Sequence, residues 1–384
     1  MNVGYCTNVH SGVSFEQALT NLKTFAVPVK QAICPDQAMG IGLWFSNEAV
    51  SVALQDGNWQ RLKRFLDDSG LVAHTFNAFP FTDFHQPVVK RQVYLPDWTS
   101  DARARYTMDV ARLQALLLPP DSIGTISTVP LGWAARDEPV SLERCASQLN
   151  QCAQQLQAIE QTSGVQIRLC LEPEPGCVLQ TSDQVVEFFN RYLFSGVESD
   201  RHRCRLGVCH DVCHAAVMQE SQQAVLQRYH ENGISISKVQ ISSAPEFQQS
   251  DQTLTDEILK PFIEPRYLHQ TSLQKGGEFH FFEDLPRALK QFPSGLSDSI
   301  WRVHFHVPIM LDAVGSMGTT QGEIESCLKW FLDHEYASHF EVETYAWEVS
   351  PASVRGSSMT DSIIAELRWL GEHYPNLSSL NRLS

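Results

Sequence analysis

Short apolar and β-branched segments alternate with longer segments of helical periodicity along almost the whole chain. This order is typical of repeated strand–helix units on a parallel sheet, because each strand is followed by a helix that covers it. We predict eight segments as strands: 2–8, 41–45, 71–79, 125–129, 167–172, 206–210, 235–241 and 340–346.

Helical periodicity fills the intervals between these strands. Within residues 14–26, for example, Phe15, Leu19, Leu22 and Phe25 fall on one face. No G-x-G-x-x-G turn follows an early strand, which argues against an open dinucleotide-binding sheet. The pattern therefore predicts an α/β protein with a closed (β/α)8 barrel. We expect helices at 14–26, 101–118, 141–161, 182–194, 213–228 and 321–335.

Two segments are longer than usual barrel loops: residues 80–100, rich in aromatic residues and proline, and residues 243–300, with several polar stretches. Long loops on the catalytic face of a barrel commonly cover a substrate. We expect one barrel domain over residues 1–375 with these two loops, followed by a frayed tail over 376–384.

Composition and charge exclude several classes of protein. With 43% hydrophobic residues among 384, the chain can bury a large core and is not a disordered protein. Its 44 acidic and 29 basic residues give a net charge of −15, which disfavours nucleic acid as a partner. The sequence shows no signal peptide and no apolar run long enough to span a membrane, which predicts a cytoplasmic protein. Its ten scattered cysteines indicate reduced thiols, and the oligomeric state stays open.

Polar residues follow the predicted strands at the end where a barrel gathers its catalytic groups. They are carboxylates, imidazoles and one amide, which are ligands of divalent cations. The candidates are Glu172, Asp211, His214, Gln240, His304, His306 and Glu343.

The two glutamates and the glutamine also have structural interpretations. Glu172 could cap a helix, but a carboxylate at a barrel mouth needs a counter-charge, and Lys and Arg are scarce nearby. Glu343 lies in an apolar strand, where an unpaired charge is costly. Gln240 suits a metal, a sugar hydroxyl or a backbone group equally well.

The other candidates are arranged in pairs. Asp211 and His214 lie three residues apart in the first turn of a predicted helix, which suits two metal ligands or one ligand and one substrate contact. His304 and His306 alternate as in a strand, so that both point to the same side. His10, His74, Asn77 and His85 lie near the ends of the first and third strands and are further candidates for substrate contact.

Glu172, the Asp211-Val-Cys-His214 element, His304-Phe-His306 and Glu343 together resemble the xylose isomerase-like TIM barrels. This group includes sugar isomerases, sugar epimerases and endonuclease IV. The resemblance implies that Glu172, Asp211 and Glu343 bind one divalent metal, with His214 on the metal or the substrate.

One position departs from that family pattern. Gln240 stands where the relatives have a metal-binding histidine on the seventh strand. We expect the remaining ligand from Gln240 or His306, while His304 and water stay open as alternatives. The nuclease relatives also have an aspartate where this chain has His304, which would remove one carboxylate from a three-zinc site.

A second resemblance extends over nearly the whole chain. The stretches YCTNVH, GIGLWFS, HTFNAFPFTDFH, HFHVP and VETYAWEV are similar to metabolite traffic proteins of the EboE type. That resemblance implies a role in handling or exporting a small metabolite, without a defined reaction.

These observations predict a metal-dependent isomerase or epimerase that acts on a small polyol or carbonyl metabolite. Glu172 and Glu343 would move the proton, while His214 and His304 or His306 would bind substrate oxygens. The ligand types suit zinc, manganese, iron or cobalt. The alternatives are a carrier that binds a metabolite without turnover and, less favoured, a phosphodiesterase of the endonuclease IV kind.

Overall fold

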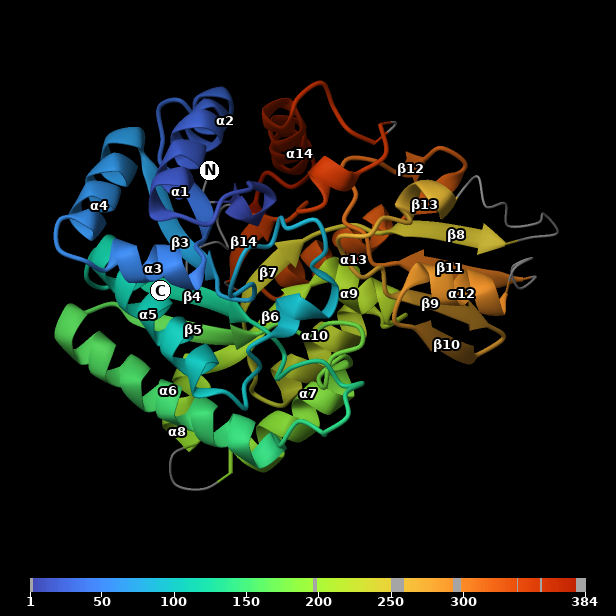
Figure 1. The fold of residues 1–384 in the computed structure, drawn as a ribbon, viewed down its shortest axis with the longest axis horizontal. Coiled ribbons are helices and arrows are strands. Elements are labelled where there is room, and N and C mark those ends of the chain that lie inside the picture. The colour runs from blue at the N-terminus through green and yellow to red at the C-terminus, as the bar shows by residue number, and fades with distance from the viewer. Residues whose placement is uncertain are drawn as a thin grey trace.

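The computed structural model describes residues 3–195, 199–249, 259–292, 298–336, 338–352 and 354–377. Eight parallel strands form its central sheet, in the order β1-β14-β7-β6-β5-β4-β3-β2 (Figure 1). A parallel bridge between Cys6 and Gly42 joins the two outer strands, so that the sheet is a nearly closed barrel. The strands are β1 (Gly4–Tyr5), β2 (Met39–Trp44), β3 (Leu71–Asn77), β4 (Ile123–Thr128), β5 (Gln166–Leu171), β6 (Leu206–Asp211), β7 (Ser235–Ile241) and β14 (His339–Val342).

Each of the eight segments predicted as a strand overlaps one of these strands, and the predicted barrel is confirmed. The first and last strands are shorter than expected. The chain leaves β1 for a 3-10 turn, η1 (Thr7–Val9), and leaves β14 before Glu343.

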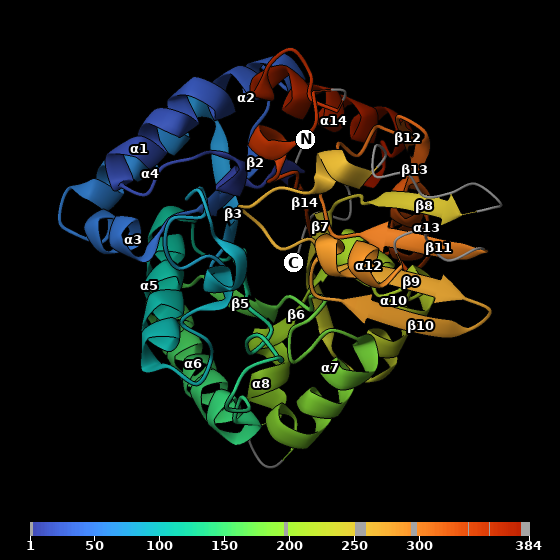
Figure 2. The ribbon, with the colours of Figure 1, turned by 45° about the vertical axis from the view of Figure 1, so that its right-hand side comes forward.

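Helices cover the outside of the barrel (Figures 1 and 2). The helix predicted at 14–26 continues to Ile33, and Pro28 lies in the first turn of α2, directly after the π-helical turns of η2. The helix predicted at 213–228 is two helices, separated where Gln219 adopts a left-handed φ of 59°. The outer helices are α1 (Phe15–Asn21), η2 (Leu22–Ala26), α2 (Val27–Ile33), α3 (Asn47–Ala53), α4 (Asn58–Ser69), α5 (Asp101–Leu117), α6 (Leu142–Ser163), α7 (Ser182–Phe188), η4 (Phe189–Leu193), α8 (Ser199–Arg205), α9 (Val212–Val217), α10 (Gln222–Glu231), α13 (Gln321–Asp333) and α14 (Met359–His373).

The segment 243–300, which we expected to be a long loop, contains regular structure. It contributes to an antiparallel sheet in the order β10-β9-β11-β8-β13-β12, which lies to one side of the barrel (Figure 2). Residues 250–258 and 293–297 of the segment, and 378–384 of the predicted tail, are outside the described residues. We call residues 245–319, which carry this sheet and its connections, the insert. Its elements are β8 (Pro245–Gln249), η5 (Lys260–Phe262), β9 (Thr271–Lys275), β10 (Glu278–Phe282), α12 (Leu285–Gln291), β11 (Ser299–Val303), β12 (Ala313–Val314) and β13 (Met317–Thr319).

The insert and the barrel mouth share one apolar cluster. Leu273 and Trp301 of the insert sheet pack in the same cluster as Trp44 of β2, Phe84 of the 80–100 segment and Tyr345 after β14. The 80–100 segment itself carries one short helix, η3 (Lys90–Tyr94). In the described part of the chain, no helix has the length and apolar character needed to cross a membrane.

Candidate metal centre

Three buried carboxylates meet at the carboxyl ends of the barrel strands. Glu172 follows β5, Asp211 is the last residue of β6, and Glu343 follows β14. Each offers one oxygen, and these oxygens lie within 4.8 Å of one another. Their side chains are almost fully buried, so their mutual repulsion is only weakly screened by water. Such a cluster is stabilised by a cation at its centre.

His306 joins this cluster from the segment that follows β11. Its Nδ1 donates a hydrogen bond to the main-chain oxygen of Glu343 at 2.8 Å, because a carbonyl oxygen can only accept. The other ring nitrogen, Nε2, is therefore unprotonated and lies 3.9 Å from Oδ2 of Asp211. Burial lowers the pKa of His306 to about 4, which favours the neutral imidazole that binds metals.

Several polar atoms at this point are buried without a hydrogen-bond partner. They are Oε2 of Glu172, Oδ2 of Asp211, Nε2 of His306 and both amide atoms of Gln240. Each such atom costs about 1–3 kcal/mol if it stays unsatisfied. A metal ion bound by the first three would satisfy them together. The residues present thus fit a divalent cation, with an oxygen-rich set that includes one imidazole.

The second oxygen of Asp211 is fixed by the protein. Its Oδ1 accepts hydrogen bonds from the main-chain N–H of His214, at 2.9 Å, and from the hydroxyl of Ser242, at 2.8 Å. Asp211 is also the N-cap of α9, which explains the first of these bonds. Burial opposes its ionisation, but His214, His306 and the hydrogen bonds outweigh this effect and lower the pKa of Asp211.

The two glutamates are harder to ionise than Asp211. Burial raises the pKa of Glu172 to about 7, against a smaller opposing effect of His214. Burial and the neighbouring Glu172 and Asp211 raise the pKa of Glu343 well above its usual value. Oε1 of Glu343 accepts hydrogen bonds from the amides of Asn8, at 2.6 Å, and Asn77, at 3.3 Å. A divalent cation bound here would lower the pKa of both glutamates, so that all three carboxylates could be ionised together.

A second group of polar residues adjoins the carboxylates. The Nε2 atoms of His214 and His304 are 3.2 Å apart, while the Nδ1 atoms donate to the oxygen of Pro173 and to Oε1 of Gln270. Burial disfavours a charged His214, but the nearby Asp211, Glu174 and Glu172 outweigh burial and raise the pKa of His214. Burial and the neighbouring His214 lower the pKa of His304 well below its usual value. His214 therefore holds the proton, and its Nε2 donates a hydrogen bond to Nε2 of His304.

Glu174 belongs to the same polar group, although we did not predict a role for it. Its Oε1 accepts hydrogen bonds from the hydroxyl of Tyr94, at 2.6 Å, and the amide of Gln270, at 3.1 Å. One ligand atom each from Glu174, His214 and His304 lies within 4.8 Å of the others. The sequence carried one signal for it, because Glu174 lies two residues after Glu172 at the end of β5.

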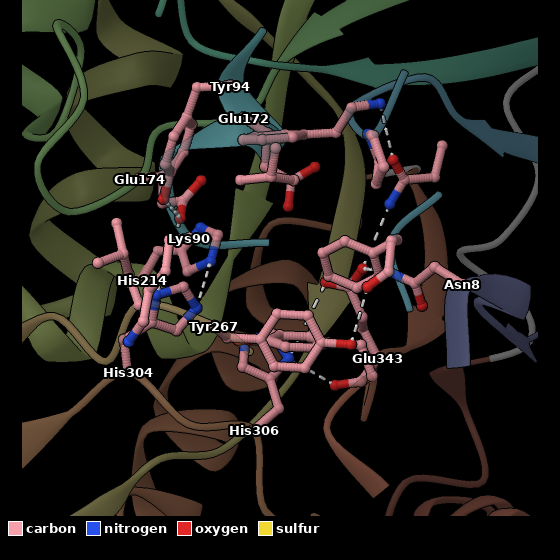
Figure 3. A pocket seen from close by; sticks show the side chains of 17 residues that line it. Asn8, Lys90, Tyr94, Glu172, Glu174, His214, Tyr267, His304, His306 and Glu343 are labelled. Atoms are coloured by element: carbon pink, nitrogen blue, oxygen red, sulfur yellow. Dashed lines mark hydrogen bonds and ion pairs between the residues drawn. The ribbon is translucent and has the colours of Figure 1, made fainter. Parts of the chain in front are cut away.

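A cavity opens over both groups of polar residues, with about 530 Å³ of empty space including its open mouth. Figure 3 shows Glu172 and Glu343 in this cavity together with His214, His304 and His306. The rest of the lining is largely apolar and comes from Phe79, the 80–100 segment and the insert. Its residues are Phe79, Pro80, Phe84, Val93, Tyr94, Tyr267 and Leu268.

The structure brings most of the predicted candidates to this cavity. Asn77, His214 and His304 line it, as do two of the three acidic candidates. Asp211 and Gln240 do not appear in the lining, and they are neighbours in the register of β6 and β7. Gln240 therefore lies at the level of the carboxylates, inside the barrel.

His10 and His74 are not brought to the cavity. His10 stacks on Phe25 with ring centroids 4.4 Å apart and bonds to the hydroxyl of Tyr5 at 2.9 Å. His74 lies three residues before Asn77 in β3, which is about 10 Å of extended chain, and its ring adjoins His339. In this structure both rings pack against other side chains, and neither lines the cavity.

The chain belongs to the xylose isomerase-like TIM barrel family, because the model of that family matches residues 37–293. Among solved structures, it is similar to one titled "Structure of L-ribulose 3-epimerase", with a TM-score of 0.51, 13% identity, and 99% of this chain and 96% of that chain covered. It is also similar to a xylose isomerase-like TIM barrel protein from Mycobacterium smegmatis in complex with magnesium, with a TM-score of 0.53, 11% identity, and 99% and 97% covered. The comparison with curated protein sequences gives no match. At these identities the two structures show the fold alone.

Proposed function

We propose that the protein is a metal-dependent isomerase or epimerase that acts on a small hydroxylated carbonyl compound. The observation that carries this proposal is the convergence of unpartnered, buried ligand atoms from Glu172, Asp211 and His306, with Glu343 beside them. These four residues would hold the metal, and Gln240 lies within the same layer of the barrel. Zinc, manganese, iron and cobalt all accept this mixture of carboxylates and imidazole.

A bound divalent cation would supply Lewis acidity at the carbonyl of the substrate. The proton chemistry belongs to the side chains. One of Glu172 and Glu343 accepts the proton from the carbon next to the carbonyl as that C–H bond breaks. For an isomer, the proton returns to the former carbonyl carbon, and the hydroxyl proton of the first carbon moves to the former carbonyl oxygen. For an epimer, the proton returns to the opposite face of the same carbon.

His214 and the two asparagines support this step. His214 keeps a proton on Nε2 through its raised pKa, and when substrate binds this N–H can turn from Nε2 of His304 to the oxygen on which negative charge develops. Asn8 and Asn77 donate to Oε1 of Glu343, which fixes the carboxylate and leaves Oε2 free of these two bonds. His85 in turn bonds through Nε2 to the main-chain oxygen of Asn8, at 2.8 Å.

Elemental analysis and isotope exchange test the proposal. Protein purified without added metal is expected to contain about one divalent ion per chain. In deuterated water it is expected to exchange the hydrogen next to the carbonyl of its ketose substrate, as followed by proton NMR. Glu172→Gln and Glu343→Gln should abolish the exchange, whereas Glu16→Gln, on the exposed surface, should not. Exchange that survives complete chelation would overturn the proposal.

The second candidate is a carrier that binds a metabolite in the same cavity without turnover. The resemblance to metabolite traffic proteins of the EboE type supports it, as does the partly apolar wall over the polar groups. Retention of a small molecule through purification, with no exchange in any ketose tested, distinguishes the carrier from the enzyme. A nuclease role has less support, because the net charge of −15 disfavours a polyanionic substrate.

A further inference from the structure

Basic side chains are scarce around the cavity, and those present are already paired. Among the described lining residues, only Lys90 is Lys or Arg. Its Nζ donates to Oδ2 of Asp284 at 2.9 Å. Arg266, which adjoins the lining residue Tyr267 in the sequence, donates to Oε2 of Glu348 at 2.9 Å. Neither cation is therefore free to bind an anionic group of a ligand.

The parts of the insert outside the described residues add no basic group. The sequences of 250–258 and 293–297 contain neither Lys nor Arg. The scarcity of cations is thus a property of the sequence around this cavity as well as of the described structure.

The segments that bind phosphate in many TIM barrels have a different structure here. In many barrels, phosphate binds to loops after the seventh and eighth strands and to the N-terminus of a short helix. Here β7 leads directly into β8 of the insert, and β14 leads into the single turn η6 (Trp347–Val349). The acidic Glu348 lies in that first turn and binds Arg266. The turn after the last barrel strand thus carries a carboxylate, which disfavours a bound phosphate there, and this carboxylate is paired with Arg266.

The charge within the cavity points the same way. Glu174 adds a fourth carboxylate to Glu172, Asp211 and Glu343. In their ionised forms, these four exceed the combined charge of one divalent cation and a protonated His214. A phosphate group carries about −1.5 to −2 at neutral pH and would be repelled.

The cavity offers groups for an uncharged ligand instead. The amides of Asn8 and Asn77, the imidazoles and the hydroxyl of Tyr94 bind hydroxyl and carbonyl oxygens. Aromatic rings of the lining, such as Phe84, are suited to pack against the C–H face of a sugar or cyclitol.

We infer that the substrate of this site is an uncharged hydroxylated carbonyl compound, and that the site excludes the phosphorylated form of the same compound. The inference rests on the proposed function in that it assigns the substrate to the same cavity. The inference goes beyond the proposed function by choosing between free and phosphorylated substrates, both of which the proposed chemistry would allow.

Calorimetric titration of the metal-loaded protein tests the inference with matched pairs: ribulose against ribulose 5-phosphate, and fructose against fructose 6-phosphate. The uncharged member of at least one pair is expected to bind at least about tenfold more tightly than its phosphate. Equal or tighter binding of the phosphates, or no binding of either uncharged ketose, would overturn the inference. Metal content, measured on the same samples, reports separately on the proposed function.

An engineered gain of phosphate binding gives a second test. Asp284→Asn removes the charge that holds Lys90 and keeps an acceptor for the main-chain N–H of His269. It should raise the affinity for the phosphorylated ketose several-fold and leave that for the free ketose unchanged. Asp109→Asn, which removes one charge from the outer face of α5, is the matched control and should change neither affinity. An equal gain in both variants would overturn the inference, because it would assign the effect to net charge.

Discussion

The imidazole of His306 and the main chain of Glu343 are joined by one hydrogen bond of 2.8 Å. This bond ties the end of the insert sheet to the end of the last barrel strand, and it determines which nitrogen of His306 faces Asp211. Strand β7 carries Gln240 rather than a histidine. The imidazole of the proposed metal site comes instead from His306, in a different part of the chain. The proposed metal centre is therefore formed by residues of both the barrel and the insert.

His306→Ala should therefore lower metal affinity by more than about 100-fold, because it removes a ligand. His304→Ala should lower it less than about tenfold, since the Nε2 of His304 faces His214 rather than Asp211. Competition with a chromogenic chelator measures both affinities. The reverse order of effects would assign the imidazole ligand to His304.

Ser242→Ala tests the support of Asp211. The variant removes the hydroxyl that donates to Oδ1, while the N-cap bond from His214 remains. Metal affinity should fall about 10-fold to 100-fold, as for other residues that orient a ligand. Ser221→Ala removes the hydroxyl that caps α10 and serves as a control for helix stability, with unchanged affinity expected.

The metal-free protein should become less stable as the pH rises. Burial raises the pKa of Glu172 from 4.5 to about 7, so the folded chain binds more protons than the unfolded chain between these values. The free energy of unfolding then falls through that window, by up to about 3 kcal/mol for this group at pH 8. Glu172→Gln should therefore raise the melting temperature of metal-free protein at pH 8 and have little effect at pH 4. A lower melting temperature at pH 8 would contradict this electrostatic account.

The buried ion pair of Lys238 and Glu341 lies inside the barrel, with 2.7 Å between Nζ and Oε1. Lys238→Met should destabilise the protein by about 3–5 kcal/mol, because it leaves Glu341 buried without its counter-charge. The double variant Lys238→Met, Glu341→Leu should recover much of this loss. Denaturant unfolding of the three proteins measures the difference, and equal destabilisation in the single and double variants would be inconsistent with it.

Glu366 of α14 links the two segments that carry His306 and Glu343. One oxygen, Oε1, accepts from the main-chain N–H of Ile309, at 3.1 Å, and from the hydroxyl of Thr344, at 2.6 Å. Glu366→Ala should destabilise the fold by about 1–3 kcal/mol and weaken metal binding. Glu366→Gln keeps an acceptor and should be close to wild type in metal binding. Equal metal affinity in all three proteins would show that α14 supports the fold alone.

Much of the barrel could be predicted because its strands are short apolar runs separated by helical periodicity. The same reasoning located the acidic candidates, since Glu172, Asp211 and Glu343 each follow a strand that ends at one face of the barrel. Their mutual approach depends on sheet closure, which the order of elements indicates.

The insert and the outer part of the cavity could not be predicted in the same way. Strands such as β9 and β11 are five residues long and mix apolar with polar positions, so they were interpreted as parts of a loop. The role of His10 was misjudged because proximity to a strand end in sequence does not fix the direction of a side chain after a turn. Tyr94 reaches the cavity, and Gln270 bonds to its lining residues Tyr94 and Glu174, only through contacts between distant segments, which no local pattern encodes.

The shared apolar cluster and the His306 bond have a consequence for the history of the chain. A shortened relative that lost the insert would keep the crowded acids of the barrel but lose both an imidazole and the hydrophobic cover above them. Such a protein would have to acquire a new ligand, for instance by restoring histidine at position 240, before the acids became tolerable. The insert thus contributes both a proposed metal ligand and the hydrophobic cover of the acidic cluster.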